Sequence, residues 1–280
     1  MRQAKLLMTV SAMAIAMAAF TFGSGCRKNK NNDTTAQTEE TNVASDHAVS
    51  EQAFEDAQTI ADQGATVTGA MNFRVSGTMS SPCATVSHSG DTTIIDFGTV
   101  DCTCRDGRTR RGKIIVVRTG VFTDSGSVRT ITFDNFYQNG NKITGLRTVA
   151  NMGHNTLGQP FYNITVAGSV LLSTGGTVGV TWNRTRTWTA GYSTTGTLTD
   201  DVYAITGSGT ITRASGAVVG VEITSPLILS MDCRYIEAGT VKYTLPSGGI
   251  RTLNYGDTPA CDNMAKLTLP SGTVYDITLR

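Results

Sequence analysis

The feature that most limits the fold of this chain is an alternation of apolar and polar residues that begins near Ala65 and continues to the C-terminus. Alternation of this kind, with turn signals from glycine, asparagine and proline roughly every ten residues, is typical of antiparallel strands. Asn139-Gly140 lies between two such runs, and this dipeptide is the strongest short signal of a β-hairpin. No helical period separates the runs, which disfavours parallel sheets with crossover helices.

We therefore expect residues 65–280 to form an all-β domain of about a dozen antiparallel strands in a meander, built as a curved sheet, a half-barrel or a sandwich. The composition agrees, because 45 threonines and 30 glycines among 280 residues suit pleated, half-exposed surface. The expected strands cover residues 94–99, 113–119, 128–137, 142–148, 161–172, 178–189, 201–206, 218–224, 239–245, 250–255, 264–269 and 274–279.

One segment before the strands has a helical period. Between Asp46 and Gln63 apolar residues recur every three or four positions, and Gly64 follows as a C-cap. The pattern predicts one amphipathic helix at residues 46–64 that covers an edge or an end of the sheet. A helix that binds a partner is the alternative.

The first 25 residues have the pattern of a signal peptide: a basic start, the apolar stretch Leu6–Phe22, and the small residues Gly23, Ser24 and Gly25. Cys26 follows directly, and this arrangement resembles the lipobox of bacterial lipoproteins. The resemblance implies that the Cys26 thiol carries a lipid and that the chain binds a membrane through it. A conventional secreted protein with a chance cysteine, or a retained anchor, is the alternative.

Residues 26–45 are polar and contain no aromatic side chain, so we expect a flexible tether. Its first residues include Arg27, Lys28 and Lys30. In lipoproteins of Bacteroidota, acidic residues at this place resemble a surface-export signal. The basic residues here favour a cell-envelope protein that is lipid-anchored at the outer membrane and faces the periplasm.

Five cysteines follow Cys26, an odd number for an oxidising compartment in which structural disulfides are expected. The simplest scheme joins Cys83 to Cys102 or Cys104, and Cys233 to Cys261. Because His47, His88 and His154 show no ligand spacing, we expect no metal site and no cofactor.

Three segments resemble a family of Bacteroidota lipoproteins of uncharacterised function. They are IDFGTVDCTCRDGRTRRGKIIV (95–116), ITFDNFYQNGNKITG (131–145) and GTVKYTLPSGGIRTLNYGDTPACDN (239–263). The resemblance implies a cell-envelope lipoprotein with one cysteine near the Asp106-Gly107-Arg108 turn and a cysteine pair near the C-terminus. It implies no activity or ligand.

The one hint of a ligand site is the row Trp182, Arg184, Arg186 and Trp188, which shares one face of an expected strand. Indole rings and guanidinium groups together can stack on sugar rings and bind their hydroxyls. The alternative, which we favour, is that both tryptophans pack at the margin of the core with the arginine stems along them.

Several function classes are disfavoured. A net charge of +1 with no basic cluster beyond the N-terminus argues against nucleic-acid binding. The G-x-S-x-G and H-E-x-x-H motifs are absent, which leaves Asp200 with Asp201, or Asp96 with Asp101, as carboxylate pairs for catalysis. We read the arginines around Asp106-Gly107 (Arg105, Arg108, Arg110 and Arg111) as solvated charges at a turn, with anion binding as the alternative.

We expect a non-catalytic cell-envelope lipoprotein with a structural role or with a protein, glycan or lipid partner. The alternatives are a carrier that holds a hydrophobic ligand in a half-barrel cavity, and a glycan-binding module that uses Trp182 and Trp188.

Overall fold

The computed structural model describes residues 30–65, 69–71, 83–194 and 197–279. One helix, α1 (Lys30–Gly64), precedes a single 15-stranded sheet. The strands are β1 (Gly69–Met71), β2 (Ala84–Ser89), β3 (Thr92–Asp96), β4 (Cys102–Thr103), β5 (Thr109–Arg118), β6 (Val128–Gln138), β7 (Asn141–His154), β8 (Pro160–Leu171), β9 (Thr177–Ala190), β10 (Val202–Thr212), β11 (Val218–Ser230), β12 (Ala238–Thr244), β13 (Ile250–Gly256), β14 (Met264–Thr268) and β15 (Val274–Thr278).

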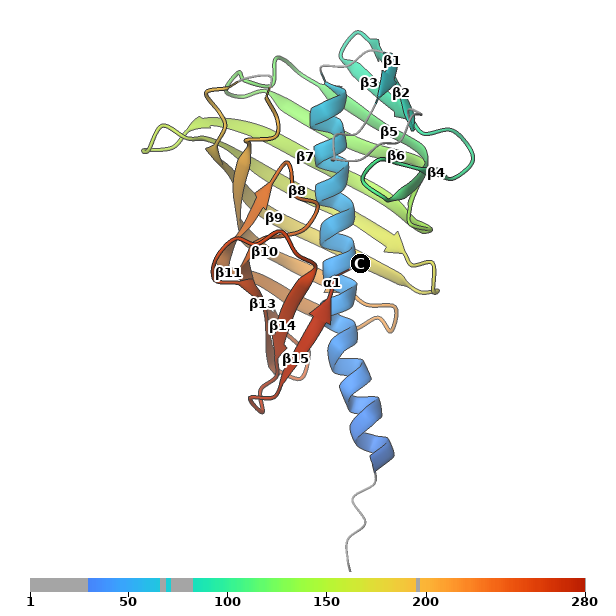
Figure 1. Cartoon of the computed structure of the whole chain (residues 1–280), viewed down its shortest axis with the longest axis vertical. Helices are drawn as coiled ribbons and strands as arrows, with labels where there is room; N and C mark the ends of the chain where they lie inside the picture. Colours follow the sequence, from blue (N-terminus) through green and yellow to red (C-terminus); the bar gives the residue numbers. More distant parts are fainter. Residues whose placement is uncertain (1–29, 66–68, 72–82, 195–196, 280) are drawn as a thin grey trace, which may run out of the picture.

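The sheet is an antiparallel meander in which strands pair in chain order from β1 to β15, with only β4 off this path, paired to β5. The sheet curves around α1 and stays open, so that the helix lies along its concave side (Figure 1). The predicted all-β meander preceded by one helix is therefore confirmed, in its curved-sheet form. Among the described residues, no helix is both long and apolar enough to span a bilayer.

Tight hairpins set the register of this meander. At the β6–β7 turn Asn139 and Gly140 have φ angles of 50° and 77°, and Gln138 pairs with Asn141. Positive φ at both turn residues is what a two-residue hairpin with the right strand twist requires, and asparagine and glycine tolerate it best. The hairpin signal in the sequence is confirmed.

A second glycine controls how closely the helix approaches the sheet. A Cβ atom on Gly168 of β8 would lie 2.6 Å from Cζ of Phe54, a fully buried residue of α1. Only a residue without a side chain leaves room for the Phe54 ring at this point. The position of α1 on the concave side therefore depends on a glycine in the sheet.

The helix is longer than predicted. It begins at Lys30 and not at Asp46, so residues 30–45 are helical and the expected flexible tether is wrong for them. Val43 and Ala44 are buried beside the sheet, and tertiary packing of this kind overrides weak local helix preference. The prediction for residues 26–29 lies outside the described residues.

The strand predictions differ from the structure in two respects. The pattern missed β2 and the short strands β1 and β4, and it ended β7, β10 and β11 several residues early. β10 and β11 contain register shifts at Ile205/Gly207 and Ile223/Ser225, where the strict period of two is interrupted. A search for uninterrupted alternation stops at such bulges.

Candidate functional site

The concave side of the sheet meets α1 through a network of buried ion pairs. Six arginines lie on strands of the sheet or directly before β5, and they pair with five carboxylates. Four of these carboxylates belong to the helix. The pairs are Arg108–Asp56 (3.0 Å), Arg108–Asp106 (3.2 Å), Arg110–Asp106, Arg129–Asp62 (2.6 Å), Arg147–Glu55 (2.9 Å), Arg184–Glu51 (2.6 Å) and Arg186–Asp62 (3.4 Å). Charges of both signs removed from water stay ionised only when paired in this way.

Glu51 lies at the centre of this network and is fully buried. Arg184 donates two hydrogen bonds to its carboxylate, at 2.6 and 2.8 Å, and Nε2 of His47 lies 3.1 Å away. Burial by itself would raise the pKa of Glu51, but the charge of Arg184 and the contact with His47 outweigh it and hold the pKa well below its usual range.

His47 connects the helix to the far part of the sheet. Its Nδ1 shares a hydrogen bond of 2.9 Å with the hydroxyl of Tyr243 in β12, and both side chains are buried. Burial lowers the pKa of His47 below 6.5, because removal of water disfavours the imidazolium more than Glu51 stabilises it. The folded protein therefore favours the neutral imidazole, and a second ring proton with its positive charge is unfavourable.

The Asp106-Gly107 turn anchors the other end of the network. Gly107 has a φ of 79° and its N–H bonds to the carbonyl of Cys104, as a tight turn requires. Arg108 and Arg110 are buried against Asp56 and Asp106, so the interpretation of these two as solvated charges is wrong. Burial raises the pKa of Asp56, whereas hydrogen bonds from Arg110 overcome burial and lower the pKa of Asp106.

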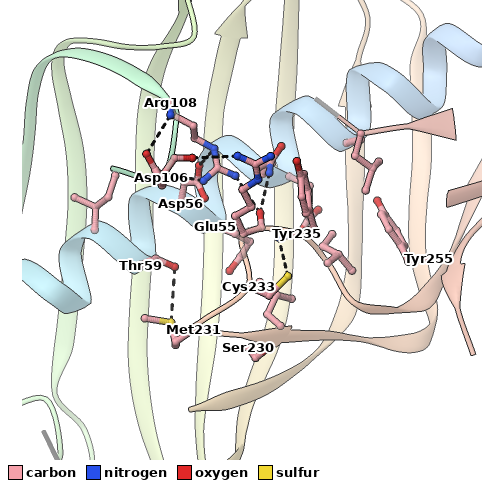
Figure 2. Close-up of a pocket in the computed structure, with 18 of the residues that line it drawn as sticks. Glu55, Asp56, Thr59, Asp106, Arg108, Ser230, Met231, Cys233, Tyr235 and Tyr255 are labelled. Atoms are coloured by element: carbon pink, nitrogen blue, oxygen red, sulfur yellow. Dashed lines mark hydrogen bonds and ion pairs between the residues drawn. The ribbon is translucent and has the colours of Figure 1, made fainter. Parts of the chain in front are cut away.

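A cleft opens beside this network, with about 80 Å³ of space open to water. Glu55 and Asp56 enter it from α1, and Met231, Cys233 and Tyr235 enter from the segment between β11 and β12 (Figure 2). Arg186 of β9 and Tyr255 of β13 also line it, together with apolar side chains: Ile60, Leu229, Ile236 and Leu279. The cleft combines charged, hydroxyl and apolar surface.

A wider groove of about 610 Å³ also lies beside α1. It runs between the helix around Asn42–Ala53, the β6–β7 turn, the β8–β9 turn and β15. Most of its lining is amide or hydroxyl: Asn42, Ser45, Gln52, Gln138, Asn139, Asn141, Ser173, Thr174 and Thr278. The structure shows no charged side chain in this groove other than Asp46 and Asp276, among the residues it describes.

The predicted stacking row lies beneath the helix. Trp182 and Trp188 are 2% and 8% exposed, and Arg184 and Arg186 are buried with them. The Trp182 ring packs edge-on against Phe54 of α1 with centroids 5.5 Å apart, and Cζ of Arg184 lies 4.7 Å from its centroid. These residues share one face, as the period of two predicted, but that face is core, and an exposed stacking platform is not present at these positions.

The disulfides follow the local scheme. Cys83 is joined to Cys102 and Cys233 to Cys261, while Cys104 is a buried free thiol. Glu237 lies near Cys233 and Cys261, but sulfurs that are bonded to each other offer no thiolate to a metal. Cys26 lies outside the described residues.

Of the carboxylate pairs considered for catalysis, Asp96 and Asp101 bind separate partners, whereas Asp200 and Asp201 influence each other. Asp96 pairs with Lys113 and Asp101 with Arg111, at 3.2 and 2.8 Å. Asp201 is buried, and burial together with the charge of Asp200 raises its pKa to about 6.

The acidic face of α1 and its arginine partners were missed by the sequence reasoning. A signal existed, since Arg184 and Arg186 stand at positions that the alternation assigns to the buried face. A comparison of the chain with protein-family models, curated proteins and solved structures gives no match.

Proposed function

We propose that this protein is a non-catalytic lipoprotein of the cell envelope, anchored through a lipid on Cys26, in which α1 is a stalk that holds the curved sheet away from the membrane. In this arrangement the helix has two parts: one reaches back toward the anchor, and the other is the centre of the domain. The periplasmic side of the outer membrane is the location that the basic residues Arg27, Lys28 and Lys30 favour.

One observation carries the proposal. α1 begins at Lys30, four residues after Cys26, and continues without interruption for 35 residues. At about 1.5 Å per residue it is roughly 50 Å long. Its first turns extend beyond the sheet, and its later turns are held on the concave side by the ion pairs of Glu51, Glu55 and Asp62 (Figure 1). A lipid on Cys26 would thus be joined to the domain core through a single helix.

The carrier alternative receives less support from this geometry. A hydrophobic ligand in a half-barrel would lie along the concave side, where α1 lies. Its entry would require α1 to leave and its buried carboxylates and arginines to lose their partners, which is strongly unfavourable. A structural or binding role for the assembled domain is therefore the stronger proposal.

The test is fractionation of cells that produce the wild-type chain or Cys26→Ala. Wild type should be found in the membrane fraction, with an acylated Cys26 peptide by mass spectrometry, because two or three acyl chains suffice to hold a soluble domain on a bilayer. Cys26→Ala should lose the acyl mass and be released.

Cys104→Ala is the matched control, since it removes the other unbridged cysteine and should leave the protein in the membrane fraction. A Cys26→Ala protein that stays bound, or a wild-type Cys26 without lipid, would refute the anchor.

A further inference from the structure

Two buried polar groups line the cleft beside α1 without a hydrogen-bond partner among the described residues. They are the hydroxyl of Tyr255 and Nε of Arg186, whose side chains are 5% and 4% exposed. Native proteins leave few buried donors unpaired, and each such group calls for an explanation, because loss of water without a replacement partner is unfavourable. Two of them at one cleft point to a ligand that accepts hydrogen bonds.

The pairing of Arg186 within the ion-pair network indicates the sign of that ligand. In the ion-pair network that the described residues form, six arginines share five carboxylates. Every one of these carboxylates is already paired with an arginine. Three further buried N–H groups of the network also lack an acceptor in the described part of the chain: Arg129 Nε, Arg147 Nη1 and Arg184 Nε. The cleft itself is lined by four arginines and four carboxylates, and Arg129, Arg147 and Arg184 do not line it. Arg186, however, shares Asp62 with Arg129 and lies 3.4 Å from it, so its charge is only partly balanced, and this favours an anionic acceptor at Arg186.

The size and the walls of the cleft limit what that acceptor can be. About 80 Å³ of space open to water is enough for a group of the size of a few water molecules. Apolar side chains such as Ile60, Leu229 and Leu279 form part of the wall. A compact oxyanion, alone or with a short apolar extension, fits these limits.

We propose that this cleft is a binding site for a carboxylate or phosphate oxyanion, which accepts hydrogen bonds from Arg186 Nε and from the Tyr255 hydroxyl. The oxyanion is either free or the headgroup of an amphiphile whose chain lies along the apolar wall. The proposal goes beyond the anchoring role and does not depend on the lipid at Cys26.

Tyr255→Phe is the decisive variant, because it removes one hydroxyl and nothing else. Since that hydroxyl has no partner among the described residues, the ligand-free variant should melt at or above the wild-type temperature. Its affinity for the oxyanion should fall about ten- to a hundredfold, the range for loss of a hydrogen bond to a charged acceptor.

Tyr243→Phe is the matched control. The Tyr243 hydroxyl is also buried but bonds to His47 at 2.9 Å, and Tyr243 does not line the cleft. This variant should melt at a lower temperature and keep wild-type affinity. Arg186→Lys, which keeps the charge but has no Nε, should lose affinity as Tyr255→Phe does.

The purified mature protein is titrated by calorimetry and by thermal melting with sodium phosphate, sodium acetate and sodium octanoate, against sodium chloride at equal ionic strength. Binding of phosphate or acetate identifies a free anion, and binding of octanoate alone identifies an amphiphile headgroup. The proposal is overturned if no probe gives binding heat or raises the melting temperature more than sodium chloride does. It is also overturned if Tyr255→Phe binds the probe with wild-type affinity, and in either case the cleft holds water only.

Discussion

Trp182 lies where the helix and the sheet meet, and its contacts with Phe54 and Arg184 make it a sensitive test of the core. Trp182→Ala should lower the free energy of unfolding by roughly 3–5 kcal/mol, because removal of a buried indole leaves a cavity that its neighbours fill only partly. Urea denaturation measures this change. Thr181→Ala, on the exposed face of the same strand, should stay within about 0.5 kcal/mol of wild type. A wild-type midpoint for Trp182→Ala would contradict the buried position of this ring.

His47 gives the protein a pH dependence with a definite sign. Burial lowers its pKa below 6.5 in the folded protein, so the unfolded chain binds the proton more readily. The stability that depends on neutral His47 is fully present above about pH 6.5. As the pH falls below this value, the free energy of unfolding decreases by at most about 1.4 kcal/mol per pH unit. Denaturant unfolding of wild type between about pH 7 and pH 5 should show this loss.

His47→Gln isolates that effect. Asp201, whose pKa is raised to about 6, acts with the opposite sign, since its proton is held more tightly in the folded state. It is present in both proteins, so the difference between the two pH profiles belongs to His47. The variant should be the less pH-dependent of the two, and parallel profiles would contradict the buried neutral imidazole.

At the residue scale, the sequence predicted which residues share a face but not what covers that face. The alternation placed Trp182, Arg184 and Arg186 together correctly. Arginine is so often solvated that its burial could not be inferred without its partners Glu51 and Asp62. Those partners are more than 120 residues away in the chain, and no local pattern joins them.

At the scale of elements, each disulfide fastens one end of the meander. Cys83–Cys102 ties the start of β2 to β4, and Cys233–Cys261 ties the β11–β12 connection to the segment before β14. The bridged residues are 19 and 28 positions apart, so each bridge should stabilise the fold by about 3 kcal/mol in the loop-entropy model.

Cys104 should therefore be the one alkylatable cysteine between β1 and the C-terminus, and only after unfolding. It is buried, and burial raises the pKa of its thiol, so little thiolate is accessible to a reagent in the native protein. Non-reducing mass spectrometry after alkylation in denaturant should show a modified Cys104 and both bridges. Rapid labelling of Cys104 in the native protein, or a bridge between Cys83 or Cys102 and the C-terminal pair, would contradict the structure.

The ends of helices and strands were predictable where the local sequence determines them. The Asn139-Gly140 hairpin needs only its own two residues, and it is where the sequence placed it. The start of α1 at Lys30 was not predictable, because no apolar period exists there, and the burial of Val43 and Ala44 depends on the folded domain.

For the whole molecule, strand alternation predicted the class of fold, because every strand on the main path pairs with its neighbour in the chain. Curvature was not predictable in the same way. The sheet curves around α1, and the interface that fills its concave side consists of pairs between residues far apart in sequence, such as Arg147 with Glu55.

This arrangement sets an order of events as the chain emerges with its N-terminus first. Because α1 precedes the sheet, Glu55 emerges 92 residues before Arg147, Glu51 emerges 133 residues before Arg184, and His47 emerges 196 residues before Tyr243. The hairpins can form one after another as the chain lengthens, since their contacts are local. The helix, in contrast, keeps Glu51 without Arg184 until β9 arrives, and His47 without Tyr243 until β12 arrives. The first element of the chain thus finds its last described hydrogen-bond partner only near the end of assembly, and a chain truncated before β12 leaves His47 without Tyr243.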